Sequence, residues 1–325
     1  MQLDHYVHTL GSHLKNRFGE RVHKLPLHAG FTCPNRDGTI GRGGCSFCSV
    51  DSFSEERSGS VDGQLAHGRQ AIAWVRRYLA YFQAYTNTYA EIEHLRALYD
   101  AALASRDVVG LCVGTRPDCV PDAVLDLLAA YQEQGAEIWL ELGLQSAFDE
   151  TLDRIHRGHG FKAYAETVAR AQARSIPVCA HLIVGLPGER AEDSLVSLER
   201  VLNEGVQGLK LHPLMIVRGS QLAAEHQRGE VALLSLEQYV ETAAEMIRRT
   251  PAEVIFHRVG ASARAPTLIA PDWCTKTLPT NNAIAHHLAR LGAQGCRTPR
   301  PYKISASPCP TPAQNSAPEP DCSGD

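Results

Sequence analysis

The sequence predicts an α/β protein with a parallel sheet or barrel. From about residue 22 onward, short apolar runs suited to strands alternate with longer stretches of helical period, and six such units can be counted. In a parallel barrel the catalytic groups gather on the loops that follow the strands. Motifs at those positions are therefore the candidates for function.

The predicted elements follow one another in a regular order. Strands are expected at 22–28, 80–86, 108–115, 137–145, 178–186 and 208–214, with helices at 61–79, 121–135 and 194–205. The helix at 121–135 begins with proline and is followed by glycine, and the stretch at 194–205 has a similar form. Two further helical stretches, 237–249 and 281–292, are expected to cover an open barrel edge.

The chain divides by composition into four parts. Seven of the 18 prolines lie in the final 29 residues, with serine and without apolar periodicity, so that tail is expected to be disordered. Its cysteines, Cys309 and Cys322, are poor ligand candidates. The predicted parts are an N-terminal segment at 1–21, the barrel core at 22–215, a helical extension at 216–296 and the tail at 297–325.

Composition favours one barrel-sized domain in a reducing compartment. The chain has 325 residues, of which 44% are hydrophobic and 21% charged. No apolar run approaches the roughly 20 residues of a membrane span, and the first residues lack a signal-peptide core, so we expect a cytoplasmic protein. The ten cysteines are irregularly spaced and lie mostly in apolar segments, as reduced cysteines do. A formal net charge of −4 gives no global attraction for nucleic acid, so RNA contact requires a local basic surface.

Three cysteines follow the first predicted strand. Cys33, Cys45 and Cys48 lie in FTCPNRDGTIGRGGCSFC, where a glycine-rich loop separates the first from the close pair. Structural zinc sites and ferredoxin centres take four protein ligands, so three imply a metal position left open for a small molecule. A [4Fe–4S] cluster held by three cysteines offers such a position to S-adenosylmethionine. Zinc with His23 or His28 as the fourth ligand, and a redox pair of Cys45 and Cys48, are the alternatives.

Seven motifs follow one another along the chain: CPNRDGTIGRGGCSFC, YFQAYTNTYAE, GLCVGTRPDCVPD, LELGLQS, RIHRGHGF, HLIVGLPGE and GLKLHPL. Their order resembles a radical SAM enzyme and, within that superfamily, the bacterial YhcC family. The match covers roughly residues 1 to 292, and its core is similar to the Elongator catalytic subunit and to oxygen-independent coproporphyrinogen oxidase. Eleven residues separate Cys33 from Cys45, where the commonest radical SAM pattern has three.

The resemblance implies a fold, a chemistry and partners. The fold is a partial (β/α)6 barrel of the TIM type with a C-terminal helical extension, and the cofactors are a [4Fe–4S] cluster and S-adenosylmethionine. The cluster would cleave S-adenosylmethionine to methionine and a 5′-deoxyadenosyl radical, which removes hydrogen from an unactivated carbon. An electron donor such as flavodoxin or ferredoxin is expected, and no membrane.

Cofactor contacts are expected at several matched positions. By resemblance Gln145 bonds the ribose and Arg157 pairs with the carboxylate of S-adenosylmethionine; a solvated basic face of Arg154, His156 and Arg157 is the alternative. Phe47 is placed to pack on adenine. Glu141, Gly143 and Gln145 share one strand face, and polar groups pointing into a barrel are costly unless they bind something. The further expected contacts are Thr115, Arg116 and Asp118 at GTRPD, and His181, for which a core role competes.

Backbone and substrate positions complete the prediction. Gly38, Gly41, Gly43 and Gly44 are expected to adopt positive φ and bring amides near the sulfides. The glycines of VGLPGE would let the backbone approach adenine. The residues that could point at substrate are Tyr81, Gln83, Tyr85, Lys210 and His212, with packing as the alternative.

The substrate is predicted by fold-level analogy alone. A transfer RNA nucleoside is the leading expectation, because the core resembles that of an RNA-modifying enzyme. The basic run of Arg154, Arg157 and Lys162 is expected beside the barrel mouth. A small metabolite is one alternative, and a zinc- or cluster-containing RNA-binding module without catalysis is the other.

Overall fold

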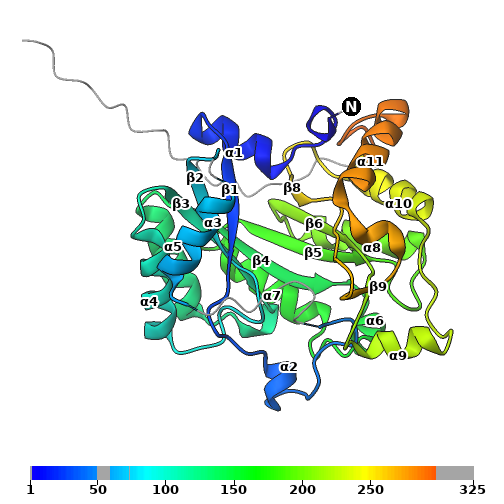
Figure 1. Ribbon diagram of the computed structural model, residues 1–325, viewed down its shortest axis with the longest axis horizontal. Coiled ribbons are helices and arrows are strands. Elements are labelled where there is room, and N and C mark those ends of the chain that lie inside the picture. The colour runs from blue at the N-terminus through cyan, green and yellow to red at the C-terminus, as the bar shows by residue number, and fades with distance from the viewer. Residues whose placement is uncertain (1, 50–58, 73, 298–325) are drawn as a thin grey trace, which may run out of the picture.

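The computed structural model describes residues 2–49, 59–72 and 74–297. Its centre is a sheet of seven parallel strands in the order β1-β2-β3-β4-β5-β6-β8, curled into a partial barrel with helices on its outside (Figure 1). This confirms the predicted fold class. The predicted tail, with Cys309 and Cys322, lies almost wholly outside the described residues. The strands are β1 (Val22–Leu27), β2 (Arg77–Phe82), β3 (Val108–Thr115), β4 (Glu137–Gln145), β5 (Val178–Val184), β6 (Gly208–Pro213) and β8 (Ile255–Arg258).

The region before β2 differs most from the prediction. The strands β3 and β4 have the predicted bounds, but the helix expected at 61–79 is α3 (Val61–Ala71), and β2 begins at Arg77. The run RYLAYF is almost completely buried. A continuous apolar run of this kind cannot be assigned to helix or strand by its periodicity. The predicted helix was therefore eight residues too long.

The C-terminal extension was predicted to be helical, but it also contributes the seventh strand of the sheet. β8 pairs with β6 in parallel register, with Gly208 opposite Ile255 and Lys210 opposite Arg258. A short antiparallel ribbon of β7 (Ile216–Val217) and β9 (Leu268–Ala270) follows. The prediction of six strands was thus one short.

Helices cover the outer face of the sheet and close one end of the barrel. Buried residues of these helices belong to the main apolar core, such as Leu95, Leu128, Val168 and Leu198. None of the described helices is both long and apolar enough to cross a membrane. The remaining helices are α1 (Leu10–Phe18), α2 (Pro34–Asp37), α4 (Ile92–Leu103), α5 (Asp122–Glu133), α6 (Asp149–Arg154), α7 (Phe161–Gln172), α8 (Ala191–Asn203), α9 (Gln221–Gln227), α10 (Leu236–Arg249) and α11 (Thr277–Leu291).

The barrel interior is apolar where the strands begin and open where they end. Leu10 and Leu14 of α1 pack on Trp139 and Ile255 in a second apolar cluster inside the barrel. α1 contacts both edge strands, β1 and β8, whereas α10 packs mainly on α8 and α11. The expected cover of the barrel edge therefore comes from α1. The carboxyl ends of the strands remain free to form a site.

Candidate active site

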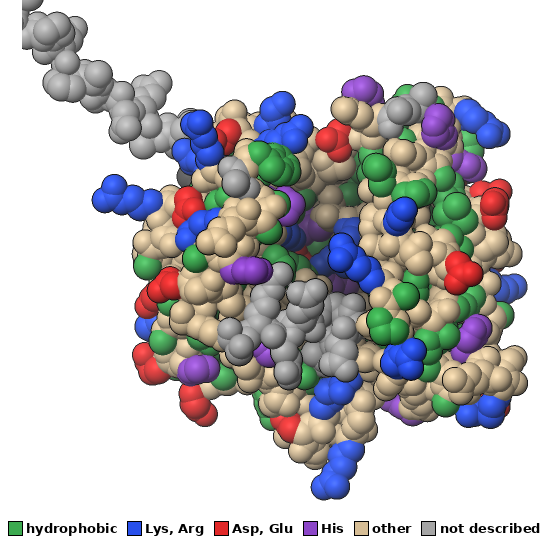
Figure 2. Space-filling model, viewed as in Figure 1, with side chains coloured by type: hydrophobic (Ala, Val, Ile, Leu, Met, Phe, Trp, Pro, Cys, Tyr) green, Lys and Arg blue, Asp and Glu red, His purple; other side chains and the backbone are tan. Residues whose placement is uncertain are grey.

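A cavity of about 790 Å³ lies at the carboxyl ends of the strands. Its walls come from the cysteine segment, from the ends of β1 to β6, and from the segment after β8. Figure 2 shows the hollow, with Lys and Arg side chains in and around it. A volume of this size suits a cofactor together with part of a substrate.

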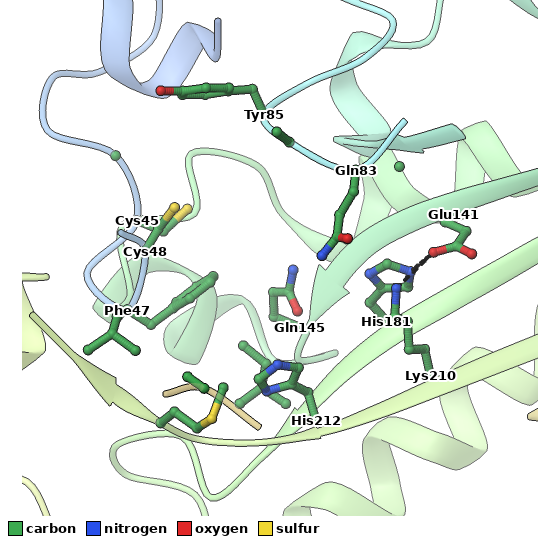
Figure 3. A pocket seen from close by; sticks show the side chains of 18 of the residues that line it. Cys45, Phe47, Cys48, Gln83, Tyr85, Glu141, Gln145, His181, Lys210 and His212 are labelled. Carbon is green, nitrogen blue, oxygen red and sulfur yellow. Dashed lines mark hydrogen bonds and ion pairs between the residues drawn. The ribbon is translucent and has the colours of Figure 1, made fainter. Parts of the chain in front are cut away.

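All three predicted cluster cysteines line this cavity. Cys33 caps the N-terminus of α2, and its carbonyl accepts a hydrogen bond from the amide of Arg36 at 2.7 Å. Cys45 is buried, and its carbonyl accepts from the amide of Cys48 at 2.9 Å. Figure 3 shows Cys45 and Cys48 side by side at the cavity wall. Within the described residues, no three His, Cys, Asp or Glu side chains are grouped to hold a single metal ion.

Glycines shape the loop between the cysteines, largely as predicted. Gly38, Gly43 and Gly44 have φ of +98°, +87° and +83°, which L side chains rarely adopt. Gly41 is needed for a different reason, because a Cβ there would lie 2.4 Å from Oδ1 of Asn35. The loop is thus folded tightly against the start of α2.

Nitrogen donors lie beside two of the three sulfurs. Nη2 of Arg36 lies 3.5 Å from Sγ of Cys48, and Nδ2 of Asn35 lies 3.5 Å from Sγ of Cys45. Burial raises the pKa of the Cys48 thiol and Cys45 adds to the effect, while Arg36 opposes it. Such donors offset negative charge on thiolates and tune the potential of a cluster that they hold. The surroundings therefore fit thiolates bound to a cluster.

Arg157 connects the cysteine loop to the end of β4. Its Nη1 lies 3.4 Å from Sγ of Cys45, and its Nε and Nη2 donate to the carbonyl of Gly143 at 3.1 and 2.5 Å. The side chain is only 6% exposed, so the solvated-face alternative is wrong. Arg154 is instead exposed and paired with Glu225 at 2.5 Å. The predicted basic run does not form one surface, because Arg157 points inward.

The end of β4 has an irregular backbone at the cavity. Gln145 has φ +84°, and the register with β5 shifts between Gly143 and Gln145. Figure 3 shows the Gln145 amide directed into the cavity. Residues held in such conformations cluster at ligand sites. A Cβ at position 143 would lie 2.9 Å from Nε2 of Gln145 and 3.0 Å from Nη2 of Arg157, so glycine gives both side chains their room.

The GTRPD segment places two of its three candidates at the cavity. Thr115 and Arg116 line it, whereas the described lining does not include Asp118. The Asp118 carboxylate instead accepts from Nε and Nη2 of Arg116 at 2.9 and 2.8 Å. This ion pair raises the pKa of Arg116 despite its burial, and Nη1 of Arg116 is buried without a partner.

Glu141 is the centre of a buried charge cluster. One carboxylate oxygen pairs with Lys24 and lies 3.0 Å from Nδ1 of His257, and the other lies 2.9 Å from Nζ of Lys210 and from Nε2 of His181. Burial alone would raise the pKa of Glu141, but Lys210 and Lys24 hold it well below its usual range. Glu141 therefore stays ionised, with both oxygens occupied.

Several groups around Glu141 also titrate abnormally. The pKa of His181, His212 and His257 falls to about 3, with burial as the main cause, so these rings are neutral near pH 7. The pKa of Lys210 falls to about 8, because burial and the nearby cations Arg258 and Lys24 outweigh Glu141. Nζ of Lys210 also donates to the hydroxyl of Tyr81 at 2.6 Å. Lys24 and His257 were missed in the sequence because neither belongs to a recognised motif.

Sequence comparison decides the family. The model of the radical SAM superfamily matches residues 35–201, and that of the radical SAM C-terminal domain matches residues 206–290. The chain belongs to the radical SAM superfamily. It is 54% identical to protein YhcC of Escherichia coli over 304 residues, which are 93% of this chain and 98% of that protein.

Two Elongator proteins are also similar to this radical SAM chain. Elongator complex protein 3 of Schizosaccharomyces pombe is 27% identical over 154 residues, which are 46% of this chain and 28% of that protein. The structure of Methanocaldococcus infernus Elp3 superposes with a TM-score of 0.62 at 18% identity, covering 84% of this chain and 64% of that one. This superposition shows the shared fold.

Membership of the radical SAM superfamily implies a [4Fe–4S] cluster and S-adenosylmethionine. The three cysteines and the donors around their sulfurs fit the cluster, and Phe47, Gln145 and Arg157 lie at the same cavity. The roles assigned to individual side chains remain predictions. The described lining includes neither glycine of the loop VGLPGE, and a Cβ at Gly185 would lie 2.9 Å from Cδ1 of Leu234.

The structure also identifies lining residues that the sequence analysis missed or misplaced. Gln83 and Tyr85 line the cavity as predicted, but from the loop after β2. Arg258 and Arg264 line it from β8 and the segment that follows. The apolar run VIF at 254–256 was the available signal for that strand.

Proposed function

We propose that this radical SAM enzyme modifies a nucleoside of transfer RNA, at a uridine or its substituent. The observation that supports the chemistry is that Cys33, Cys45 and Cys48 face one cavity with Gln145 and Arg157. The similarity to Elongator complex protein 3 supports RNA as the substrate. Because this chain spans only 28% of that protein, the reaction of Elongator as a whole is not carried over.

The residues of the cavity have distinct proposed tasks. Arg157 binds the carboxylate of S-adenosylmethionine and orients the cysteine loop, while Gln145 bonds the ribose and Phe47 covers the adenine. Reductive cleavage of S-adenosylmethionine to a 5′-deoxyadenosyl radical is the chemistry that the bound cluster supplies. Flavodoxin or ferredoxin is the proposed electron donor, in the cytoplasm.

RNA contacts are proposed around the cavity mouth and not along the run from Arg154 to Lys162. Both exposed cations of that run already have a carboxylate partner. Nζ of Lys162 lies 3.8 Å from Glu166, and Arg154 pairs with Glu225. Arg36 and Arg264 line the cavity without a carboxylate partner in the described part of the chain. Binding to phosphates through such residues weakens as salt rises.

The proposal is tested by mass spectrometry of transfer RNA nucleosides. Cells that lack the gene should lose one modified uridine or accumulate its precursor. The wild-type gene should restore the nucleoside, and a Cys45→Ala gene should not. A Cys296→Ala gene is the matched control, since Cys296 is exposed and lies away from the cavity lining. Identical nucleosides in all strains, together with 5′-deoxyadenosine formation that transfer RNA fails to stimulate, would contradict the RNA assignment.

A further inference from the structure

The described lining of the cavity carries far more positive than negative charge. It contains one carboxylate, that of Glu141. The cations are Arg36, Arg116, Arg157, Lys210, Arg258 and Arg264. Arg116 is paired with Asp118, and Arg36 and Arg157 lie beside cysteine sulfurs that become thiolates when a metal is bound. Of the remaining cations, Lys210 pairs with Glu141, whereas Arg258 and Arg264 have no such explanation in the described residues.

Glu141 cannot neutralise these remaining cations. Its two oxygens already pair with Lys24 and Lys210, so this cluster alone has one positive charge in excess. Arg258 adds a second. The surrounding rings add no negative charge, because His181 and His212 are neutral and burial raises the pKa of Tyr81 well above its usual range. Uncompensated buried charge is costly unless a counter-ion binds.

Arg258 is the cation that most clearly lacks a partner. It ends β8, opposite Lys210 in the parallel register, and it lines the cavity. Its Nε is buried without a hydrogen-bond partner, and no carboxylate in the described ranges forms an ion pair with its guanidinium. A guanidinium presents a planar fork that matches a carboxylate or a phosphate.

We infer that Arg258, with Lys210, forms a subsite that binds an anionic group of the substrate, either a carboxylate or a phosphate. Figure 3 shows Lys210 and His212 across the cavity from Cys45 and Cys48. An anion held here would fix one end of the substrate while the rest extends toward the cysteines. The inference deepens the proposed function, since it concerns the substrate of the same cavity.

The subsite is distinct from the one proposed for the cofactor. Arg157 and Gln145 lie at the end of β4 and at the cysteine loop, and Arg157 contacts Cys45 itself. Arg258 lies on β8, which is the third strand beyond β4 in the sheet. Loss of Arg258 should therefore weaken binding of small anions without weakening binding of S-adenosylmethionine.

The test uses reconstituted protein saturated with S-adenosylmethionine and two probes, ¹³C-acetate and inorganic phosphate. Line broadening in ¹³C and ³¹P spectra gives the affinity of each. Arg258→Gln should lower the affinity for the preferred probe by about tenfold, as expected when one charge-assisted hydrogen-bond pair is lost. Arg258→Lys should restore part of the affinity. Arg174→Gln is the control, because it removes one positive charge from an exposed ion pair with Asp126.

The outcomes separate the sources of the anion. Preference for acetate assigns the subsite to a carboxylate, and preference for phosphate assigns it to a nucleotide phosphate. Equal binding by wild type and Arg258→Gln would overturn the inference. So would a loss of S-adenosylmethionine affinity in Arg258→Gln as large as that in Arg157→Ala, since the anion would then belong to the cofactor. If anions bind through Arg258 while nucleosides from gene-deleted cells are unchanged, the subsite stands and the RNA assignment fails.

Discussion

The guanidinium of Arg157 joins Cys45, whose sulfur lies 3.4 Å from Nη1, to the carbonyl of Gly143, which accepts from Nε and Nη2. One buried side chain thus fixes the cysteine loop against the end of β4. The contact spans 112 residues of sequence to the sulfur and 14 to the carbonyl. It couples the position of the proposed cofactor contacts to that of the metal ligands.

Replacing Arg157 with alanine should weaken S-adenosylmethionine binding without removing the cluster. Loss of one charge-assisted hydrogen-bond pair costs on the order of 1.5–3 kcal/mol, or about ten- to a hundredfold in affinity. The three cysteines remain, so iron content should not fall. Calorimetry on reconstituted protein measures the affinity, with Arg174→Ala as the control. Unchanged affinity would remove Arg157 from the cofactor site.

Gly143→Ala should reproduce part of that defect. The new Cβ would lie 2.9 Å from Nε2 of Gln145 and 3.0 Å from Nη2 of Arg157, so at least one of these side chains must move. Gly11→Ala is the matched control, because its nearest neighbour outside the helix is 3.8 Å away. We expect lower S-adenosylmethionine affinity for the first variant alone. Equal affinities for the two would show that the positions of Gln145 and Arg157 do not matter.

Glu141→Gln should destabilise the protein strongly. Removing this charge leaves the half-buried Lys24 and the buried Lys210 without a counter-ion, and breaking a buried pair typically costs on the order of 3–5 kcal/mol. Urea unfolding measures the change. Glu93→Gln, at an exposed residue 3.7 Å from Arg96, should cost less than about 1 kcal/mol. A Glu141→Gln protein as stable as the wild type would contradict the charge-cluster description.

The half-buried histidines of the cavity should make the protein less stable in mild acid. The pKa of His212 falls from 6.5 to about 3 on folding, so between these values the unfolded chain binds more protons and the free energy of unfolding drops as pH falls. His212→Gln should flatten the dependence by up to about 1.4 kcal/mol per pH unit. His67→Gln, at an exposed position, should leave it unchanged. Urea unfolding from pH 7 to 4.5 tests this, and equal slopes for His212→Gln and wild type would refute it.

The sequence predicted those parts of the fold whose signal is local. β3 and β4 have the expected bounds because each is an apolar run between clear turn signals. β8 was missed because it is only four residues long and follows a helical region. The edge contact of α1 could not be predicted either, since the bridge from Thr9 to Phe256 depends on how far the sheet curls.

The residues of the site also separate into those that local sequence motifs predict and those that only the fold brings together. The cysteines and Gln145 belong to motifs, so their places on loops after strands could be predicted. The contact between Arg157 and Gly143 joins a loop to the end of β4, and the positive φ of Gln145 is not indicated by its residue type. The pairing of Glu141 with Lys24 and His257 joins residues more than a hundred positions apart. Only the curling of the sheet brings these groups together.

The most direct test is reductive cleavage of S-adenosylmethionine by anaerobically reconstituted protein. Wild type should hold about four irons and four sulfides per chain and form 5′-deoxyadenosine with a reductant. The triple variant Cys33→Ala, Cys45→Ala, Cys48→Ala should do neither, while Cys296→Ala should match wild type. A triple variant that keeps a full cluster, or a wild-type protein that holds one zinc and cleaves nothing, would contradict the account.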